Sequence, residues 1–433
     1  MLLDSMWVLL TRLVQRGANL LVFMLLARAL TPAELGLYGY VVSTALVLSV
    51  AFDLGLRQGA AAVVGASPDR AGEAAGQLLL LWCGLGSLAS AAAWAMMAWG
   101  GLAEAGATAM ILAVAAVAPM LLVRMAQGLF LGAGELKRLN QSELVSRALL
   151  LLLTALLWAL GRLDLAAALA LMALSQLAAA AFVLGCIRTD LRWKPIADRA
   201  MAGELLRRGF GFAGAILLMI LSGRIGVWLV AWLQPPAEAG SYFAVLRLAE
   251  MLVEVATAVG VVVFSHGVRM ADDAAAAAAT AGVGRTVTAC MALGALIAGA
   301  FAAPALTLVL GSGYAGDATA LRWALGGAVA SCLVMILYPG LSSRGRAPVG
   351  IWIFGAAVVV NLASGLALVP AFGAAGAAAA FAAGQWAAGM AVVVAYRRIH
   401  GLGFRQLLLP GAMDLRQLLQ PLRRRRASLA PGG

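Results

Sequence analysis

Long apolar stretches recur along almost the whole chain and are separated by short polar or glycine-rich linkers. Each stretch has roughly the 20 residues that an α-helix needs to cross the ~30 Å hydrocarbon core of a bilayer. The pattern therefore predicts an all-α polytopic membrane protein. We expect twelve transmembrane helices, near residues 5–29, 37–60, 77–100, 108–131, 143–160, 164–187, 209–232, 242–264, 283–303, 319–341, 348–369 and 375–396.

The linkers between these stretches differ in charge in an alternating way. The linkers LTPAELG, GLAEAGA, LQPPAEAG, GSGYAGD and PAFGAAG contain no Lys or Arg, whereas the intervening ones carry pairs such as Lys137 with Arg138 and Arg344 with Arg346. Arg162 lies in a linker that should lack basic residues, but the same linker also holds the acid Asp164. Because Lys and Arg are enriched in cytoplasmic loops, we expect a multi-pass protein of the inner (plasma) membrane with both termini in the cytoplasm.

A short motif occurs twice at matching places. PAELGLY at Pro32–Tyr38 returns as PAEAGSY at Pro236–Tyr242, 204 residues later. Proline at a helix start explains either copy alone, but two copies at equivalent positions indicate a parallel repeat of two six-helix lobes around a central cavity. We expect an N-terminal lobe (1–190), a cytoplasmic interfacial linker (191–208), a C-terminal lobe (209–397) and a basic cytoplasmic tail (398–433).

Composition excludes an ordinary soluble domain, since 63% of the 433 residues are hydrophobic, 12% are charged and the mean hydropathy is +0.96. The net charge of +12 would suggest nucleic acid in a soluble chain, but here the basic residues lie in linkers and report orientation, so we expect no nucleic-acid partner. The basic tail, with four arginines from Arg423, is expected to bind anionic lipids.

Arginine occurs inside the first apolar stretch, where a lipid-facing helix should have none. Arg12, Arg16 and Asn19 share one helical face, and a central Arg costs ~2.5–3.5 kcal/mol on insertion scales. This face must therefore line a protein interior or a hydrated cavity. An ion pair with an acid of another helix is the alternative for Arg16.

Further charges lie within other predicted helices. Arg124 and Arg224 lie in the fourth and seventh spans, and Arg247, Glu250 and Glu254 share a face of the eighth. The arginines are candidate substrate-binding residues of a cavity.

The acids Asp53, Glu250 and Glu254 are candidates for ion coupling. An internal Arg247–Glu250 pair, or a capping role for Asp53 near Arg57, are the structural alternatives. No metal-ligand spacing is present, and we expect neither metal nor cofactor.

Several segments resemble a known family over residues 5–400, notably ARALTPAELGLYGYVVSTALVLSVAFDLGL, LKRLNQSELVSRALLLLL, TLVLGSGYAGDATALRW and NLASGLALVPAFGAAGAAAAFAAGQ. They are similar to Wzx-type polysaccharide (O-antigen) flippases of the multidrug/oligosaccharidyl-lipid/polysaccharide (MOP) exporter superfamily. The resemblance implies alternating access between two lobes, which moves undecaprenyl-diphosphate-linked oligosaccharide from the cytoplasmic to the periplasmic leaflet for surface or exopolysaccharide biosynthesis.

Candidate partners under this resemblance are the lipid-linked oligosaccharide and the polymerase and export components. One position departs from the family pattern. An Asp commonly precedes the seventh-helix Arg, whereas Ser222 and Gly223 precede Arg224 here, so a coupling role is not carried over to that position.

Three functions were compared. A flippase for lipid-linked oligosaccharide is favoured, because deep arginines outnumber deep acids and the guanidinium group binds phosphate in a bidentate manner. A multidrug or organic-cation exporter would need an acid-dominated cavity. The acids Asp53, Glu250 and Glu254 keep this function as the alternative. A membrane enzyme would need catalytic groups on long external loops, and the predicted external linkers are short. We therefore predict a transporter rather than an enzyme.

Overall fold

The computed structural model describes residues 17–191, 193–194 and 197–408. Within these ranges the chain forms α-helices joined by short turns and 3-10 helices, and it contains no β-strand. Ten of the described helices are long and apolar enough to cross a membrane. This confirms the predicted all-helical, multi-pass membrane architecture.

The first half of the chain contains a helix over Gly17–Ala29 and the helices α2 (Pro32–Ala51), α3 (Leu56–Ala66), α4 (Ala71–Trp99), α5 (Ala107–Ala115), α6 (Val117–Gly132), α7 (Leu136–Ala159) and α8 (Leu165–Thr189). The break between α2 and α3 lies at Leu54 and Gly55, whose φ angles are 49° and 80°. This left-handed backbone suits glycine and ends α2 before the chain continues as α3.

The second half contains α9 (Arg199–Leu233), α10 (Pro236–Arg269), α11 (Asp273–Ala300), α12 (Ala302–Leu310), α13 (Ala318–Ser342), α14 (Val349–His400) and α15 (Phe404–Leu408). Residues 199–208, which belong to the predicted interfacial linker 191–208, form the first turns of α9 and continue directly into the membrane-spanning part. Within α14 the backbone leaves helical geometry at Gly373 (φ 52°, ψ −129°), between the two predicted spans 348–369 and 375–396.

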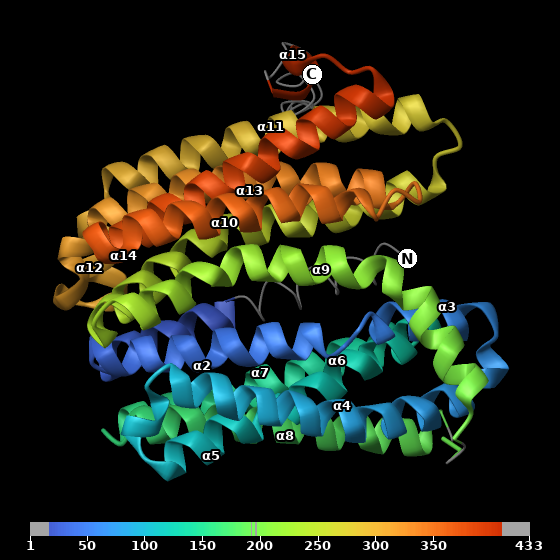
Figure 1. Ribbon diagram of the computed structural model, residues 1–433, viewed down its shortest axis with the longest axis horizontal. Helices are drawn as coiled ribbons and strands as arrows, with labels where there is room; N and C mark the ends of the chain where they lie inside the picture. Colours follow the sequence, from blue (N-terminus) through green and yellow to red (C-terminus); the bar gives the residue numbers. More distant parts are fainter. Residues whose placement is uncertain (1–16, 192, 195–196, 409–433) are drawn as a thin grey trace, which may run out of the picture.

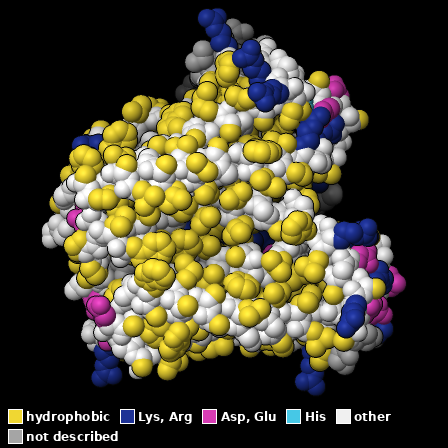
Figure 2. All heavy atoms as spheres, viewed as in Figure 1, with side chains coloured by type: hydrophobic (Ala, Val, Ile, Leu, Met, Phe, Trp, Pro, Cys, Tyr) yellow, Lys and Arg dark blue, Asp and Glu magenta, His cyan; other side chains and the backbone are white. Residues whose placement is uncertain are grey.

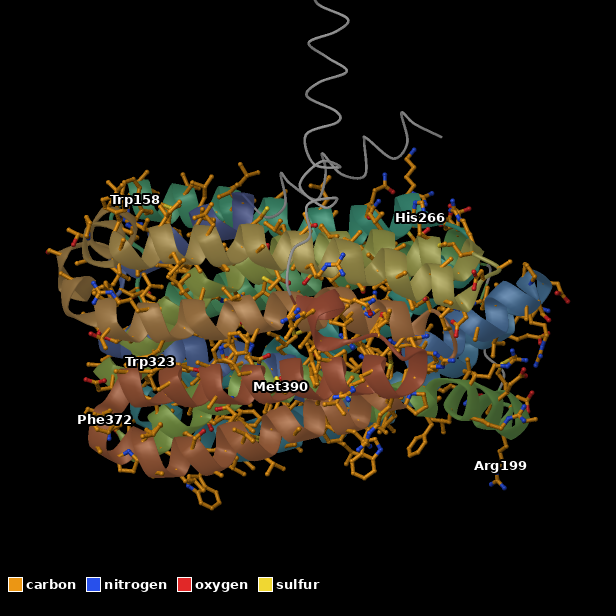
Figure 3. All side chains as sticks on the ribbon, turned by 90° about the horizontal axis from the view of Figure 1, so that it is seen from above. Trp158, Arg199, His266, Trp323, Phe372 and Met390 are labelled. Atoms are coloured by element: carbon orange, nitrogen blue, oxygen red, sulfur yellow. The ribbon has the colours of Figure 1, made fainter. Side chains whose placement is uncertain are left out.

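The helices run roughly side by side, with α4–α8 on one side of the molecule and α10–α14 on the other (Figure 1). Their turns gather at two ends. We call the end with Arg70, Arg138 and Arg344 the basic end, and the end with the turns before Pro32 and Pro236 the far end. Arg199 and His266 lie at the basic end, whereas Trp158, Trp323 and Phe372 lie at the far end (Figure 3).

Between the two ends the surface is apolar. Uncharged side chains cover the broad middle of the face in Figure 2, and charged ones gather mainly at its ends. Large hydrophobic side chains such as Phe210, Leu296 and Trp352 are 74%, 71% and 82% exposed. So much exposed apolar area is incompatible with water and is what a helix bundle presents to lipid.

The two copies of the repeated motif contact each other at the far end. A Cβ on Gly36 would lie 2.4 Å from the Pro236 carbonyl oxygen, and a Cβ on Gly240 would lie 1.8 Å from the Pro32 carbonyl oxygen. The contact is reciprocal, because each glycine packs against the proline that begins the other helix. Glycine is therefore required in each copy to let α2 and α10 cross in backbone contact.

A second reciprocal glycine contact lies between α3 and α9. A Cβ on Gly55 would lie 2.3 Å from the Gly209 carbonyl oxygen, and a Cβ on Gly209 would lie 2.0 Å from the Gly55 carbonyl oxygen. Nearby, Arg70 pairs with Glu204 of α9 at 3.0 Å. The start of α9 is thus fixed against helices of the first half of the chain.

At the basic end a single guanidinium group joins two turns, the one between α10 and α11 and the one between α13 and α14. Arg344 Nε donates to Asp273 Oδ1 at 2.7 Å, and its Nη1 donates to the carbonyl oxygens of Gly267 (3.1 Å) and Met270 (2.6 Å). Arg346 also pairs with Asp273, at 3.1 Å. Arg344 therefore satisfies the last carbonyls of α10 while it neutralises the acid that begins α11.

We expect Gly240→Ala to weaken the crossing of α2 and α10, because its new methyl group would overlap the Pro32 carbonyl group. Overpacking of this kind costs ~1–3 kcal/mol. The thermal unfolding midpoint in detergent should fall by several degrees. Gly326→Ala is the matched control, since no atom lies within 4 Å of its Cβ position in α13. Equal midpoints for both variants would contradict the crossing.

We expect Arg344→Ala to destabilise the protein by ~2 kcal/mol, because hydrogen bonds from a charged donor contribute ~1.5–3 kcal/mol. Denaturant unfolding in detergent measures this change. Arg398→Ala serves as the control, since Arg398 is exposed. A loss of stability for Arg344→Ala no larger than for Arg398→Ala would show that the two turns hold together without the guanidinium group.

Candidate functional site

A cavity of about 150 Å³ lies between the helix Gly17–Ala29, α2, α7 and α10, and we call it the Glu250 cavity. Arg247 follows Pro236 by 11 residues along α10, a rise of ~16 Å from the far end. The cavity is therefore near the middle of a ~30 Å hydrocarbon core. Its polar lining residues are Asn19, Tyr38, Arg247, Glu250 and Glu254.

Glu250 bridges two arginines of neighbouring helices. Its Oε1 lies 2.8 Å from Nη2 of Arg224 on α9, and its Oε2 accepts a hydrogen bond from Nη1 of Arg247 at 3.1 Å. The side chain of Arg224 is 11% exposed and that of Glu250 21%. Charges this far from water are tolerated only when they are paired, so Glu250 lets two guanidinium groups approach each other at mid-membrane depth. The internal Arg247–Glu250 pair considered from the sequence is present.

The two arginines retain unused bonding capacity. Arg224 Nη1 is buried and has no hydrogen-bond partner in the described part of the chain. Two guanidinium groups share one carboxylate, which leaves a positive excess within this trio. The Arg247 guanidinium also lies over the Phe243 ring, 5.4 Å from its centroid. Arg247, which lines the cavity, thus offers charge-assisted donors for an anion beside aromatic surface, and Glu254 of the same lining adds a second carboxylate.

Two of the predicted site residues, Arg12 and Arg16, lie outside the described residues. Asn19, the third residue of the predicted polar face, is described and lines the Glu250 cavity. The expectation that this face borders a cavity is thus supported at Asn19, and the positions of the two arginines stay a prediction.

Arg124 and Asp53 lie elsewhere. Arg124 lines a separate cavity of about 310 Å³, formed by α2, α3, α6, α7 and α8, together with Arg57, Glu143 and Arg147. Arg124 Nε lies 3.7 Å from Asp53 Oδ2, and Asp53 Oδ1 accepts from the backbone N–H of Arg57 at 3.3 Å. Asp53 is thus a capping and charge-balancing residue at the break before α3. The structure does not bring Arg124 into the cluster around Glu250.

The aromatic side chains of the Glu250 cavity were not predicted from the sequence. Tyr38 ends the first copy of the repeated motif, and Phe243 directly follows the second copy. The repeat was a usable signal, because the two copies of the motif contact each other and both aromatic residues lie at the ends of these copies. Charge within an apolar stretch, the signal behind the other predicted site residues, does not mark aromatic residues.

A neutral polar cluster between α9, α13 and α14 was also missed. Asn361 Nδ2 donates to the Ser222 carbonyl oxygen at 2.8 Å, and Ser331 Oγ donates to Gln385 Oε1 at 3.0 Å. Ser222, two residues before Arg224, therefore lies in a buried cluster of uncharged groups. Among the described residues, no group of three or more His, Cys, Asp or Glu side chains is placed to hold a metal ion.

Comparison with solved structures shows the fold. Lipid II flippase MurJ in an inward closed conformation matches with a TM-score of 0.75 at 10% identity, covering 100% of this chain and 94% of that one. An inward-facing multidrug resistance MATE family transporter of the MOP superfamily matches with a TM-score of 0.67 at 14% identity, covering 89% and 94% of the two chains.

A MOP superfamily transporter from Pyrococcus furiosus, whose binding pocket is described as having reverse polarity, matches with a TM-score of 0.58 at 15% identity, covering 90% and 93%. No curated protein matches the chain. The family model described as polysaccharide biosynthesis protein matches residues 2–264, which is more than half of the sequence. In agreement with the resemblance to Wzx-type flippases, the chain has the MOP fold and belongs to the polysaccharide biosynthesis protein family.

Proposed function

We propose that this protein is a flippase that moves undecaprenyl-diphosphate-linked oligosaccharide from the cytoplasmic to the periplasmic leaflet of the inner membrane, for surface or exopolysaccharide biosynthesis. The observation that carries the proposal is the Arg224–Glu250–Arg247 cluster beside a mid-membrane cavity. A diphosphate is the anionic part of such a lipid, and arginine is the side chain best suited to bind it.

In this proposal Glu250 acts as an internal counter-anion. It balances Arg224 and Arg247 while the site holds no substrate, so that two positive charges do not repel each other in a low-dielectric interior. A diphosphate carries more charge than one carboxylate and takes over Arg247, the more exposed of the two arginines at 34%. On release Glu250 pairs with Arg247 again, which keeps the substrate from binding too tightly to leave.

The transport cycle that we propose is alternating access between two six-helix lobes, 1–190 and 209–397, joined by residues 191–208. Twelve helices are consistent with the ten described spans, the kink within α14 and the helix Gly17–Ala29. The basic end faces the cytoplasm in this proposal, and the tail 398–433 binds anionic lipid there. Opening toward the periplasm then requires α2 and α10 to separate at the glycine crossing.

An organic-cation exporter is the alternative, since MATE transporters share the fold. Two observations make this alternative weaker. Glu250 is engaged by two arginines, and the Phe243 ring face is covered by Arg247. A cation would have to displace guanidinium groups from both the acid and the aromatic ring. For ion coupling, Glu254 and Asp53 are the acids we propose to test, with Asp53 already paired to Arg124.

We expect Arg247→Ala to lower polysaccharide export at least tenfold at unchanged protein level, because a charge-assisted contact contributes ~1.5–3 kcal/mol. Arg247→Lys should retain part of the activity, since lysine keeps the charge and loses the bidentate fork. Arg16→Ala and Arg16→Lys should behave in the same way. Export is measured in a strain that lacks its own flippase gene, with exposed Arg162→Ala as control. Full export by Arg16→Ala or Arg247→Ala would refute the arginine site.

Replacing the internal counter-anion should separate binding from transport. We expect Glu250→Gln to bind inorganic diphosphate about tenfold more tightly, because the competing carboxylate is gone, and to export less because release slows. Binding is measured on purified protein that still unfolds cooperatively, with Glu250→Asp as a variant that keeps the charge. Glu143→Gln, a carboxylate change in the Arg124 cavity, is the control. Weaker diphosphate binding by Glu250→Gln would contradict the exchange.

A further inference from the structure

A third cavity, of about 510 Å³, lies at the far end, and we call it the Trp232 cavity. Its walls come from both halves of the chain: Leu37 of α2, Trp99 at the end of α4 and Glu104 after it, and Trp232 and Pro236 at the turn between α9 and α10. We propose that this cavity is a binding subsite for the sugar portion of the substrate. The inference rests on the proposed flippase function and adds a separate site to it.

Trp232 is held with its ring face available. Its indole Nε1 donates to the Tyr40 hydroxyl group at 3.4 Å, and Nε1 of the neighbouring Trp228 donates to Thr44 Oγ1 at 3.0 Å. The two indole rings are stacked, with centroids 6.2 Å apart and planes 18° apart. A tryptophan that only anchors a helix at the membrane surface has its N–H directed to headgroups and water. Here the N–H groups point into the protein, while Trp232 remains 46% exposed.

Tyr40 also fixes the opposite wall. Its hydroxyl group donates to the Met96 carbonyl oxygen at 2.7 Å, near the end of α4. A Cβ on Gly100 would lie 2.3 Å from the Tyr40 ring, so the turn after Trp99 packs directly on that ring. Trp99 is 85% exposed. One buried tyrosine thus positions both tryptophan-bearing segments of the cavity.

The chemistry of the lining fits an uncharged sugar. A pyranose ring has an apolar C–H face that packs on the electron-rich face of an indole, and hydroxyl groups that donate to carboxylates. Among the described lining residues Glu104 is the charged one, and its negative charge disfavours a diphosphate at this place. The volume lies in the ~300–1,000 Å³ range of sites that hold small ligands.

The position of the Trp232 cavity suits a substrate that also occupies the Glu250 cavity. Pro236 lines the Trp232 cavity and Arg247 lines the Glu250 cavity. The two residues are 11 positions apart on α10, or ~16 Å along the helix. In this proposal one lipid-linked oligosaccharide places its diphosphate at the Glu250 cavity and its outer sugars in the Trp232 cavity. The Trp232 cavity also borders the glycine crossing, because Leu37 follows Gly36 and Pro236 contacts it. A sugar bound there lies where the two halves have to separate.

The test uses purified full-length protein and two soluble probes: the neutral repeat-unit oligosaccharide released from the host cell's own polysaccharide, and inorganic diphosphate. We expect the double variant Trp99→Ala/Trp232→Ala to bind the oligosaccharide about tenfold more weakly, since two aromatic contacts are lost. Its diphosphate binding should be unchanged. Trp99→Phe/Trp232→Phe, which keeps aromatic faces, should remain within about threefold of the parent protein.

Trp158→Ala and Trp323→Ala are the matched controls, because these tryptophans are 46% and 52% exposed at the same end of the molecule and do not line the cavity (Figure 3). An equal loss in the controls would overturn the subsite in favour of membrane anchoring. Unchanged oligosaccharide binding in the double variant would overturn it as well. The subsite would also be overturned if the parent protein bound tetraphenylphosphonium through the two tryptophans and did not bind the oligosaccharide.

Different experimental results would refute the sugar subsite and the flippase function. If a strain lacking this gene accumulates no lipid-linked oligosaccharide, the proposed function is wrong. A different result refutes the subsite alone. In that case the lipid accumulates and Arg247→Ala blocks export, but the tryptophan double variant binds the oligosaccharide as well as the parent protein does.

Discussion

The cost of placing charge inside a bilayer governs the arrangement of this protein's central residues. Two guanidinium groups, on α9 and α10, lie at a depth where water is scarce, and the carboxylate of Glu250 contacts both. Removing either arginine leaves the carboxylate partly unpaired, and removing the carboxylate leaves two like charges close together. Ionisable residues within a membrane commonly mark substrate or ion pathways, and on this ground we propose that the cluster binds an anion, with Glu250 occupying the arginines until the substrate arrives.

Close backbone contacts position this cluster. Gly36 and Gly240 let α2 cross α10 at the far end, while Gly55 and Gly209 let α3 contact α9. In lipid, where helices gain little from hiding apolar surface, small residues that permit such approach are a principal source of helix association. Among the described residues no ion pair joins α2 to α10, so separation of this crossing does not require an ion pair to be broken. A contact of this type is suited to open and close.

The sequence predicted the membrane-spanning architecture and part of the site. Apolar length is a strong signal, which is why the helices and even the interruption near Gly373 follow the expected spans. Helical periodicity also placed Arg247 and Glu250 on one face correctly. It did not show that Glu250 reaches Arg224, because that contact depends on how α9 packs against α10. For the same reason Arg124 was grouped with the other arginines, whereas packing places it with Asp53 in another cavity.

Direct measurement of leaflet exchange tests the arginine site most sharply. Purified protein is reconstituted in vesicles that carry the lipid-linked oligosaccharide isolated from a strain lacking this gene, and a sugar-modifying reagent that cannot cross the membrane reports the fraction in the outer leaflet over time. The parent protein is expected to expose nearly the whole pool, whereas vesicles with Arg247→Ala should stay near the half exposed without protein. Equal exchange by the parent protein and Arg247→Ala would show that the Glu250 cluster does not bind the lipid diphosphate.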